Sequence, residues 1–224
     1  GTCQDKVINL AIAGDPVSFS YIGSRTLKGL AENGHIVPVN IPESMKSMYQ
    51  PGILDTVTHL GQQWGFPHAF STKALFMNCD VLAEAGLACE GPQSWDELYS
   101  MAETIQNNTG IAGIGLAGKD FDNTMHQFLN YLYSNGGQVI DPNTNEITLN
   151  SPNTVETLEF YAKLANVSQE GPLAWERSQL TELFNDKKIA MYINGPWGAG
   201  QHGDINQKTV RIPAGPNGSQ GTLL

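Results

Sequence analysis

The chain has 224 residues, 15% of them charged, and a formal net charge of -10 at pH 7. This length suffices for one large domain or for two smaller lobes. Lys and Arg are scattered singly, so the sequence offers no basic patch for the phosphates of a nucleic acid or for an anionic membrane surface, and nucleic acid is not expected as a partner. The apolar runs are as short as strands and are broken by Gly, Pro or charged residues, so none is expected to span a bilayer.

The three cysteines are too few for a disulfide scaffold, and none has the spacing of a zinc site. We therefore expect no metal and no cofactor. Cys79 and Cys89 flank a predicted short helix; a disulfide between them in an oxidising compartment and a pair of free thiols both remain open. Cys3 could be the remnant of a lipid-modified cysteine, although two residues precede it.

The first part of the chain alternates predicted strands and helices. Residues 7–13 are rich in β-branched side chains, which indicates a strand that Gly14 ends. A second β-prone run at 17–21 leads into a helix of about residues 24–32, which Asn33 and Gly34 close. Two more elements are predicted before residue 64: a short extended piece at 35–39 and a helix around 53–60.

The middle of the chain holds the clearest elements. Residues 74–77 indicate a buried strand. Ser94 and Glu97 have the spacing of a capping box, which predicts a helix that Gly110 ends. The buried face of this helix is expected to hold Trp95, Leu98, Ala102 and Ile105.

Helices and short strands also alternate in the last half. Ser151 and Pro152 predict the start of a helix as its N-cap and first-turn proline. The face of this helix is expected to use Val155, Leu158, Tyr161, Ala162 and Leu164. The other predicted elements are an extended piece at 111–116, a helix at about 124–134 ending at 135–137, a turn at 141–145 between short strands, a helix at about 179–185 and a strand at 189–193. This alternation favours an α/β fold.

Short motifs spread over residues 14 to 217 carry the most information about function. The clearest is 190–198 (AMYINGPWG), a strand that ends in Asn-Gly-Pro-Trp. The others, in chain order, are 14–16, 30–34, 36–39, 64–67 (WGFP), 75–78, 82–86, 92–98 (PQSWDEL), 135–137, 151–153 and 184–191. Their order resembles that of the bacterial solute-binding proteins for carbohydrates, the group that includes the maltose-binding proteins, and a chance match would not keep this order.

The resemblance implies an α/β, two-lobed periplasmic-binding-protein fold of type II. Residues 1–70 would form part of the N-terminal lobe and residues 71–224 the C-terminal lobe, with crossing strands near 66–76. One mono- or oligosaccharide would bind in the cleft between the lobes, which close on it like a Venus flytrap. The closed form would then be recognised by the permease of an ABC importer.

The resemblance also implies that the protein binds and releases its ligand without chemistry, so that it is no enzyme. It would act as a monomer outside the cytoplasm, in the periplasm or anchored to the cell surface. The chain departs from the family pattern at two places. No long helix and second strand separate residues 7–13 from Gly14, and the chain stops at Leu224, where the family continues with several helices. We therefore expect an incomplete N-terminal lobe, in a fragment or in a chain with omitted segments.

A sugar site needs an aromatic platform for the C–H faces of the ring and side chains that exchange hydrogen bonds with its hydroxyl groups. Trp197 lies at a strand end between glycines, which favours an exposed ring. The resemblance makes it the stacking platform, with packing at a hinge as the alternative. Ser71 follows the Gly-x-Pro turn, where similar proteins place a polar contact, and His68 and Phe70 are its neighbours.

Further candidates lie where helices begin. Phe121 and Asn123 open the helix at 124–134 and are candidate contacts, whereas Asp122 between them is expected to be its N-cap. Tyr21 and Ser24 lie at a strand-to-helix junction, the cleft-facing end of an open α/β sheet, although Ser24 could simply cap its helix. Trp64 and Trp175 are candidates both for the rim of the site and for the core.

Other functions remain open. A glycoside-active enzyme would need two carboxylates about 5 to 9.5 Å apart, and only Asp122 and Glu176 suggest themselves, with nothing to place them together. A protein of the same fold could bind a non-sugar solute, such as a peptide, a polyamine or a metal ion; an amine would want acidic residues beside the aromatic ones. Presentation of a ligand to a membrane sensor is a further alternative.

Overall fold

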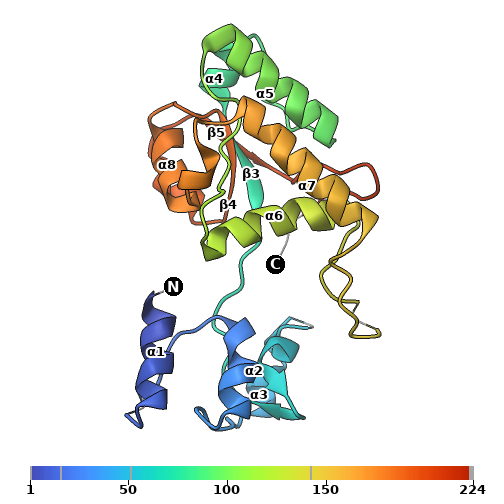
Figure 1. The fold of residues 1–224 in the computed structure, drawn as a ribbon. Helices are drawn as coiled ribbons and strands as arrows, with labels where there is room; N and C mark the ends of the chain where they lie inside the picture. The colour runs from blue at the N-terminus through green and yellow to red at the C-terminus, as the bar shows by residue number, and fades with distance from the viewer. Residues whose placement is uncertain (1, 16, 51, 142, 222–224) are drawn as a thin grey trace. The chain divides into compact units, whose positions relative to one another are not determined.

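The structure is a computed structural model that describes residues 2–15, 17–50, 52–141 and 143–221. The chain divides into two compact units, a first unit of Gly1–Phe70 and a second unit of Ser71–Leu224 (Figure 1). The crossing strands predicted near 66–76 are seen only from residue 74 onward, because residues 66–73 have no strand partner among the described residues.

The first unit is small and mostly helical. Its strands β1 (Thr58–His59) and β2 (Gln62–Gln63) form an antiparallel hairpin, with Thr58 opposite Gln63. Buried Leu27, Leu30 and Val57 supply part of its apolar interior. Its elements are the helices α1 (Thr2–Ile12), α2 (Ser24–Glu32) and α3 (Glu43–Lys46), the 3-10 helix η1 (Leu54–Val57), and the strands β1 (Thr58–His59) and β2 (Gln62–Gln63).

The strand predicted at residues 7–13 is wrong, because this segment is part of helix α1. Gln4, Val7, Ile8 and Ala11 are partly buried at helical spacing, so the period of 3.6 prevails over the β-propensity of the branched residues. Gly14, at a φ of 77°, ends the helix, and the Asp15 N–H donates to the carbonyl of Leu10 at 3.0 Å. A helix, and not a strand, therefore leads directly to Gly14. Pro16 of this motif and the side chain of Cys3 lie outside the described residues.

Three other predictions in the first unit meet different outcomes. Helix α2 has the predicted bounds, and Gly34 follows it at a φ of 69°. The β-prone run at 17–21 forms no strand among the described residues. Residues 35–39, predicted as an extended piece, are not assigned to a strand either, although the Val39 N–H donates to the carbonyl of Gln63 in β2 at 2.8 Å. The helix predicted at 53–60 is reduced to η1, after which the chain enters β1.

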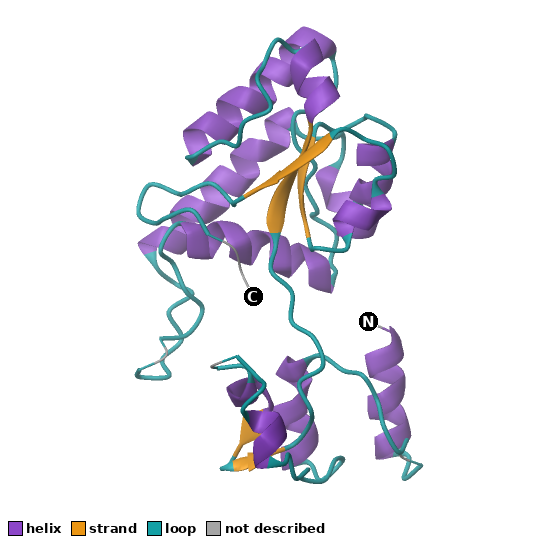
Figure 2. Ribbon diagram, turned by 180° about the vertical axis from the view of Figure 1, so that it is seen from behind, coloured by secondary structure: helices purple, strands orange, loops and turns teal. Residues whose placement is uncertain are grey.

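The second unit is built on a three-stranded antiparallel sheet in the order β4-β3-β5, formed by β3 (Ala74–Asn78), β4 (Met191–Asn194) and β5 (Gln207–Val210). Residues 111–116, predicted to be extended, make single parallel bridges, of which Gly115 to Tyr192 adds to the β4 side. Figure 2 shows the strands with helices on both sides. The remaining elements are α4 (Cys79–Glu84), α5 (Trp95–Thr109), α6 (Asp122–Ser134), α7 (Pro152–Leu164), η2 (Ala165–Val167), η3 (Pro172–Ala174), α8 (Arg177–Asn185) and α9 (Gly198–Gln201).

The period of two along β3 divides the core between the two faces of this sheet. Leu75 and Met77 pack in the larger cluster with residues of α5 and α7, whereas Phe76, between them, packs with Leu180 and Phe184 of α8. All five side chains are at most 1% exposed. The strand is therefore buried on both faces, as its uninterrupted apolar sequence predicts.

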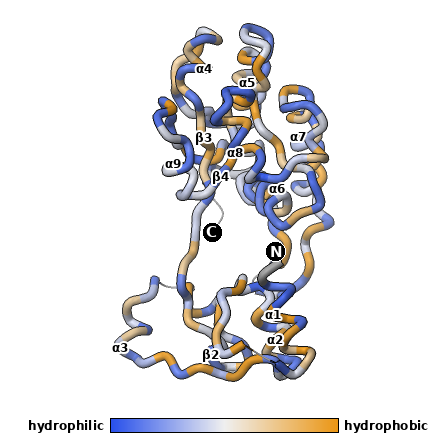
Figure 3. Tube along the Cα trace, turned by 90° about the vertical axis from the view of Figure 1, so that its left-hand side faces the viewer, coloured by the Kyte–Doolittle hydropathy of each residue, from blue (hydrophilic) through white to orange (hydrophobic). Residues whose placement is uncertain are grey.

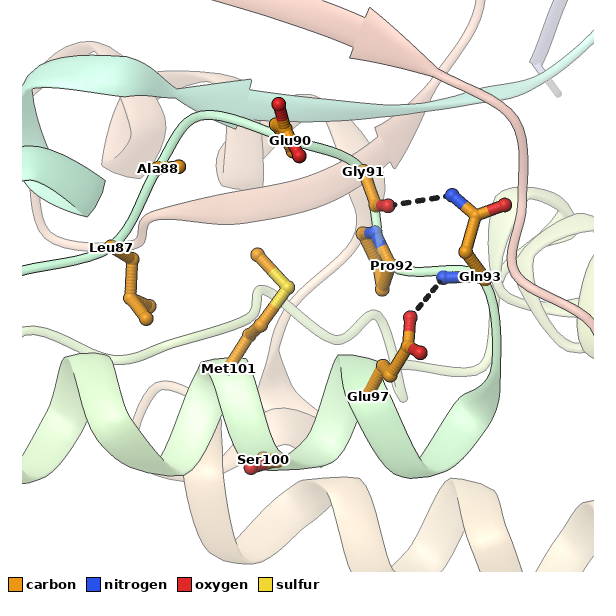
Figure 4. Close-up of a pocket in the computed structure, with 9 residues that line it drawn as sticks. All are labelled: Leu87, Ala88, Glu90, Gly91, Pro92, Gln93, Glu97, Ser100 and Met101. Atoms are coloured by element: carbon orange, nitrogen blue, oxygen red, sulfur yellow. Dashed lines mark hydrogen bonds between the residues drawn. The ribbon is translucent and has the colours of Figure 1, made fainter.

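Helix α5 confirms the predicted cap with one change. The Ser94 hydroxyl accepts from the Glu97 N–H at 3.2 Å, and Gly110 ends the helix at a φ of 73°. The Glu97 carboxylate accepts from the N–H of Gln93, at 2.6 Å, instead of that of Ser94 (Figure 4). The four residues predicted for its inner face, Trp95, Leu98, Ala102 and Ile105, are all buried.

Helix α7 begins as predicted, with the Ser151 hydroxyl accepting from Thr154 N–H, but its predicted inner face is partly wrong. Val155 and Leu158 are 51% and 53% exposed, whereas Thr157 and Phe160 are buried. Phe160 stacks on Trp95 with ring centroids 4.3 Å apart, and this large aromatic contact turns the helix away from the face that the aliphatic residues suggested.

Cys79 and Cys89 form a disulfide, which resolves the alternative left open by the sequence. The bond joins the start of α4 to the loop before α5. In Figure 3 hydrophobic residues occur in short stretches interrupted by hydrophilic ones, and no helix among the described residues is long and apolar enough to cross a membrane.

A close approach between α5 and the following extended segment should make Gly113 indispensable for stability. A Cβ at this position would overlap the backbone carbonyl of Ala102, which cannot move without distorting α5. We expect Gly113→Ala to lower the free energy of unfolding by about 1 to 3 kcal/mol in urea denaturation. Gly200→Ala is the control, because a Cβ there meets no atom within 4 Å. Equal stability of the two variants would contradict the packing described here.

Candidate functional site

The pairing of β3 with β4 brings together the segments that precede and follow these strands. The strands are antiparallel, and Ala74 at the start of β3 lies opposite Asn194 at the end of β4. Ser71 and Lys73, just before β3, and Trp197, just after β4, are therefore placed at one edge of the sheet. Nothing in the sequence separation of these segments predicts their proximity.

Trp197 presents part of its indole ring to solvent from this edge. Its side chain covers the backbone of Gly195, where any Cβ would overlap the ring. The residue is nevertheless 41% exposed, so the ring is supported by Gly195 and remains partly open to solvent. An aromatic ring held in this way can stack against the C–H face of a ligand at little further cost in conformational entropy.

Two cations lie against the same ring. Lys73 Nζ is 5.1 Å and Arg177 Cζ 5.2 Å from the ring centroid of Trp197, within the range of cation–π attraction. Lys73 also donates to the Ser71 hydroxyl at 3.0 Å. Burial, and secondarily the charge of Arg177, lowers the pKa of Lys73 from its ordinary value.

A buried network of polar side chains fixes Arg177. Its Nη1 donates to Asn194 Oδ1 at 2.8 Å, and the amide nitrogen of Asn194 donates to the Tyr192 hydroxyl at 2.6 Å. That hydroxyl in turn contacts Thr181 Oγ1 at 3.2 Å and His202 Nε2 at 2.9 Å. Burial lowers the pKa of His202, which favours the neutral ring at pH 7, so the network is neutral apart from Arg177.

The starts of helices α6 and α8 meet beside these residues. Glu176 is the N-cap of α8, and its carboxylate accepts from the Ser178 N–H at 2.9 Å and from Asn123 Nδ2 at 3.4 Å. Phe121 is the N-cap residue of α6 and is 46% exposed. The prediction that Asp122 caps α6 is wrong, because Asp122 is already the first helical residue and no side chain caps this helix.

The structure thus links only some of the predicted contacts. Lys73 contacts both Ser71 and the ring of Trp197. Asn123 donates a hydrogen bond to Glu176, which directly precedes Arg177 in the chain. The indole nitrogen of Trp175 donates to the carbonyl of Glu170 at 2.9 Å. Its ring packs against the core cluster that contains Phe76 and Phe184, which favours the core role considered for it.

The other predicted contacts belong to the first unit. Tyr21 and His68 meet edge to face with ring centroids 5.4 Å apart, and both are exposed. The indole nitrogen of Trp64 donates to the carbonyl of His59 at 2.9 Å, and Phe70 is 56% exposed. Ser24 is the first residue of α2, and no side chain caps that helix, so the capping role considered for Ser24 is wrong.

Lys73, Arg177 and Asn194 were not predicted as site residues. A single Lys or Arg in an acidic chain indicates solvated surface in most cases. The two cations converge only in the tertiary structure, where the register of β3 and β4 places Lys73 and a hydrogen bond to Asn194 holds Arg177. Of these three residues, only Asn194 could have been identified from the sequence. It immediately precedes the Gly-Pro-Trp turn, and a polar residue at the end of a buried strand usually has a hydrogen-bonding role.

A surface hollow elsewhere in the second unit contains none of these residues. It has a volume of about 390 Å³ and lies between the loop before α5 and the outer side of that helix (Figure 4). Among the described residues, no group of three or more His, Cys, Asp or Glu side chains is placed to hold a metal ion.

The sequence profile of a protein family covers nearly the whole chain. Residues 1–221 match the profile described as "Bacterial extracellular solute-binding protein". The chain belongs to this family. Among curated relatives, this solute-binding protein is 26% identical to the maltodextrin-binding protein of Bacillus subtilis over 204 residues, which are 86% of the chain and 46% of the relative. It is 24% identical to the maltotriose-binding protein of Pyrococcus abyssi over 76% of the chain and 35% of the relative.

Solved structures show the fold of this solute-binding protein. A solute-binding protein of an ABC transporter from Thermotoga lettingae, bound with α-D-tagatose, superimposes with a TM-score of 0.85 at 24% identity, over 97% of this chain and 60% of that one. The acarbose-binding GacH receptor of Streptomyces glaucescens gives a TM-score of 0.83 at 23% identity, over 99% and 60%. The two-lobed α/β fold is thereby confirmed. The chain spans about half the length of the first curated relatives that it matches, 53% for a Brucella abortus protein.

The network beneath Arg177 should contribute to the stability of this solute-binding protein. Tyr192→Phe removes a buried hydroxyl and leaves the Asn194 amide without its acceptor. We expect the free energy of unfolding to fall by about 1 to 3 kcal/mol, measured by urea denaturation. Tyr133→Phe provides the control, because Tyr133 is 43% exposed. If both variants had the same urea midpoint as the unsubstituted protein, the network would contribute nothing to the free energy of unfolding.

Proposed function

We propose that this protein binds a mono- or oligosaccharide outside the cytoplasm and delivers it to the permease of an ABC importer. Membership in the extracellular solute-binding family supports the general role. The observation that carries the choice of a sugar is the ring of Trp197, supported by Gly195 and surrounded by side chains that can donate and accept hydrogen bonds. This combination matches the two kinds of surface that a pyranose presents.

The residues around Trp197 support a sugar more than the other solutes considered. An amine or polyamine would be repelled by Lys73 and Arg177, the two cations at this ring. Ser71, Asn123 and the cations offer the donors that a sugar hydroxyl can use. Five residues of the first unit, namely Tyr21, Ser24, Trp64, His68 and Phe70, stay in the proposal as further ligand contacts.

We further propose that binding occurs without turnover. Glu176, one of the two carboxylates considered for a hydrolytic mechanism, caps helix α8 and accepts from Ser178 and Asn123. A carboxylate held in these two hydrogen bonds at a helix start is not free to approach a scissile bond. The relatives that support this view carry names of binding proteins.

Thermal denaturation with a panel of sugars tests the proposal. A ligand that binds only the folded state stabilises it by about 2.7 kcal/mol at a hundred times its dissociation constant, so at least one mono- or oligosaccharide should raise the melting temperature in a saturable way. The panel includes maltodextrins, galactooligosaccharides and their monomers, with a peptide and a polyamine for comparison. Stabilisation by the peptide or polyamine alone, or the release of sugar products, would refute the proposal.

Replacement of Trp197 tests its role as the platform. We expect Trp197→Ala to weaken binding of the stabilising sugar at least about tenfold, as expected for loss of an aromatic stacking contact, and to leave the melting temperature of the free protein nearly unchanged. Affinity is measured by isothermal titration calorimetry. Tyr133→Ala, which removes another exposed aromatic side chain of the second unit, should bind as the parent does. A large loss of stability in Trp197→Ala would instead identify its ring as a packing element.

A further inference from the structure

Glu176 lies beside the candidate site through its neighbour in the chain. Arg177 follows it directly, has its Cζ 5.2 Å from the ring centroid of Trp197, and donates to Asn194 at the end of β4. Burial lowers the pKa of Arg177, and the charge of Glu176 raises it in part, so the two charges are close enough to interact. A carboxylate is therefore held next to the residues that border the indole.

The start of helix α6 is attached to the same strand. Gln127, which is 2% exposed, donates from Nε2 to the carbonyl of Ile193 at 3.2 Å. Asn123 lies one turn earlier on the same face of α6, and its Nδ2 donates to Glu176 Oε2 at 3.4 Å. A carboxylate oxygen can only accept, so the amide nitrogen is the atom that faces Glu176. The strand thus fixes the two helix starts relative to each other.

The two oxygens of the Glu176 carboxylate are engaged differently. Oε2 accepts from the Ser178 N–H at 2.9 Å and from Asn123, which fixes the side chain in its capping position on α8. Oε1 has no hydrogen-bond partner among the described residues, and it is not one of the buried atoms that lack a partner there. A charged acceptor with unused lone pairs is therefore accessible in a fixed orientation.

This free oxygen supplies what the other polar side chains of the site lack. Lys73 and Arg177 can only donate hydrogen bonds, whereas each hydroxyl group of a sugar has a hydrogen to donate as well as lone pairs to accept with. Hydrogen bonds to an ionised acceptor are shorter than those between neutral groups and roughly twice as strong. A carboxylate oxygen is thus the strongest acceptor that a side chain could offer to a hydroxyl group here.

We infer that Glu176 is a specificity-determining residue of this site, whose Oε1 accepts a hydrogen bond from one hydroxyl group of the bound sugar. This inference rests on the proposed function and specifies its ligand, which must carry an unmodified hydroxyl group at that position. A deoxy or O-methylated sugar would remove water from the charged oxygen without offering a donor, and would be rejected. The carboxylate need not move for this role, so its capping bonds persist in the complex.

Deoxy sugars test the inference in the protein as its gene encodes it. The sugars that stabilise the protein, beginning with glucose, galactose and maltose, are compared by isothermal titration calorimetry with derivatives in which one hydroxyl group at a time is replaced by hydrogen. We expect the loss of one particular hydroxyl group to weaken binding at least about tenfold, the effect of one hydrogen bond to a charged acceptor.

Glu176→Gln assigns this contact to the carboxylate. The amide keeps one oxygen for the Ser178 N–H but presents a donor to the sugar where the parent has an acceptor. The variant should bind the complete sugar at least about tenfold more weakly and distinguish it from the critical deoxy derivative by less than about threefold, while the penalties for the other derivatives persist. Glu182→Gln, which changes an exposed carboxylate of the same helix, should bind as the parent does.

Glu176→Asp separates ligand binding from helix capping. Asp is a preferred N-cap residue, so the melting temperature of the free protein should stay near that of the parent, whereas the shorter side chain withdraws the carboxylate and should weaken binding at least about tenfold. This variant keeps the inference testable if Glu176→Gln is unstable. Parent-like affinity in both variants, or undiminished rejection of every deoxy derivative by Glu176→Gln, overturns the inference but not the proposed function. Binding of no sugar by the parent overturns both.

Discussion

The second unit depends on the antiparallel pairing of β3 with β4. This pairing gives the sheet its two buried faces, because Leu75 and Met77 point to α5 and α7 while Phe76 points to α8. The same register sets Ala74 opposite Asn194, and so fixes which loop residues meet at the sheet edge. The core and the candidate site therefore depend on the same set of backbone hydrogen bonds. A shift of one residue in the register would exchange the two faces of the sheet and disrupt both.

The polar network under the site shows how this arrangement is made rigid. Asn194, Tyr192 and His202 are all buried, and each satisfies its neighbour. A buried polar group is tolerated only when its hydrogen bonds are made, so the network permits few alternative positions for Arg177. Arg177 and Lys73 then border an indole whose ring lies against the backbone of Gly195. Pre-organisation of this kind lowers the entropy that binding would otherwise cost.

Much of this could be predicted from local sequence, and the failures have identifiable causes. Ser94 with Gly110, and Ser151 with Pro152, mark helix ends through interactions within a few residues, so the prediction of α5 and of the start of α7 was confirmed. The segment 7–13 was misread because Val and Ile favour strands only when a strand partner exists, and there the helical period decides. Lys73 and Arg177 are 104 positions apart, and only tertiary pairing brings them to one ring. The exposed side of α7 was missed because the Trp95–Phe160 stack depends on another helix.

The contact of Trp197 with Gly195 has a consequence for how this site can evolve. Since the ring occupies the space of a Cβ at position 195, a larger residue there is tolerated only after the indole has been lost or has moved. The order of mutations is thus constrained: the aromatic residue must change first, and once position 195 has acquired a side chain, the tryptophan cannot return to the same place. After both positions have changed, the original arrangement can return only if position 195 first reverts to glycine, so two substitutions are needed in a fixed order.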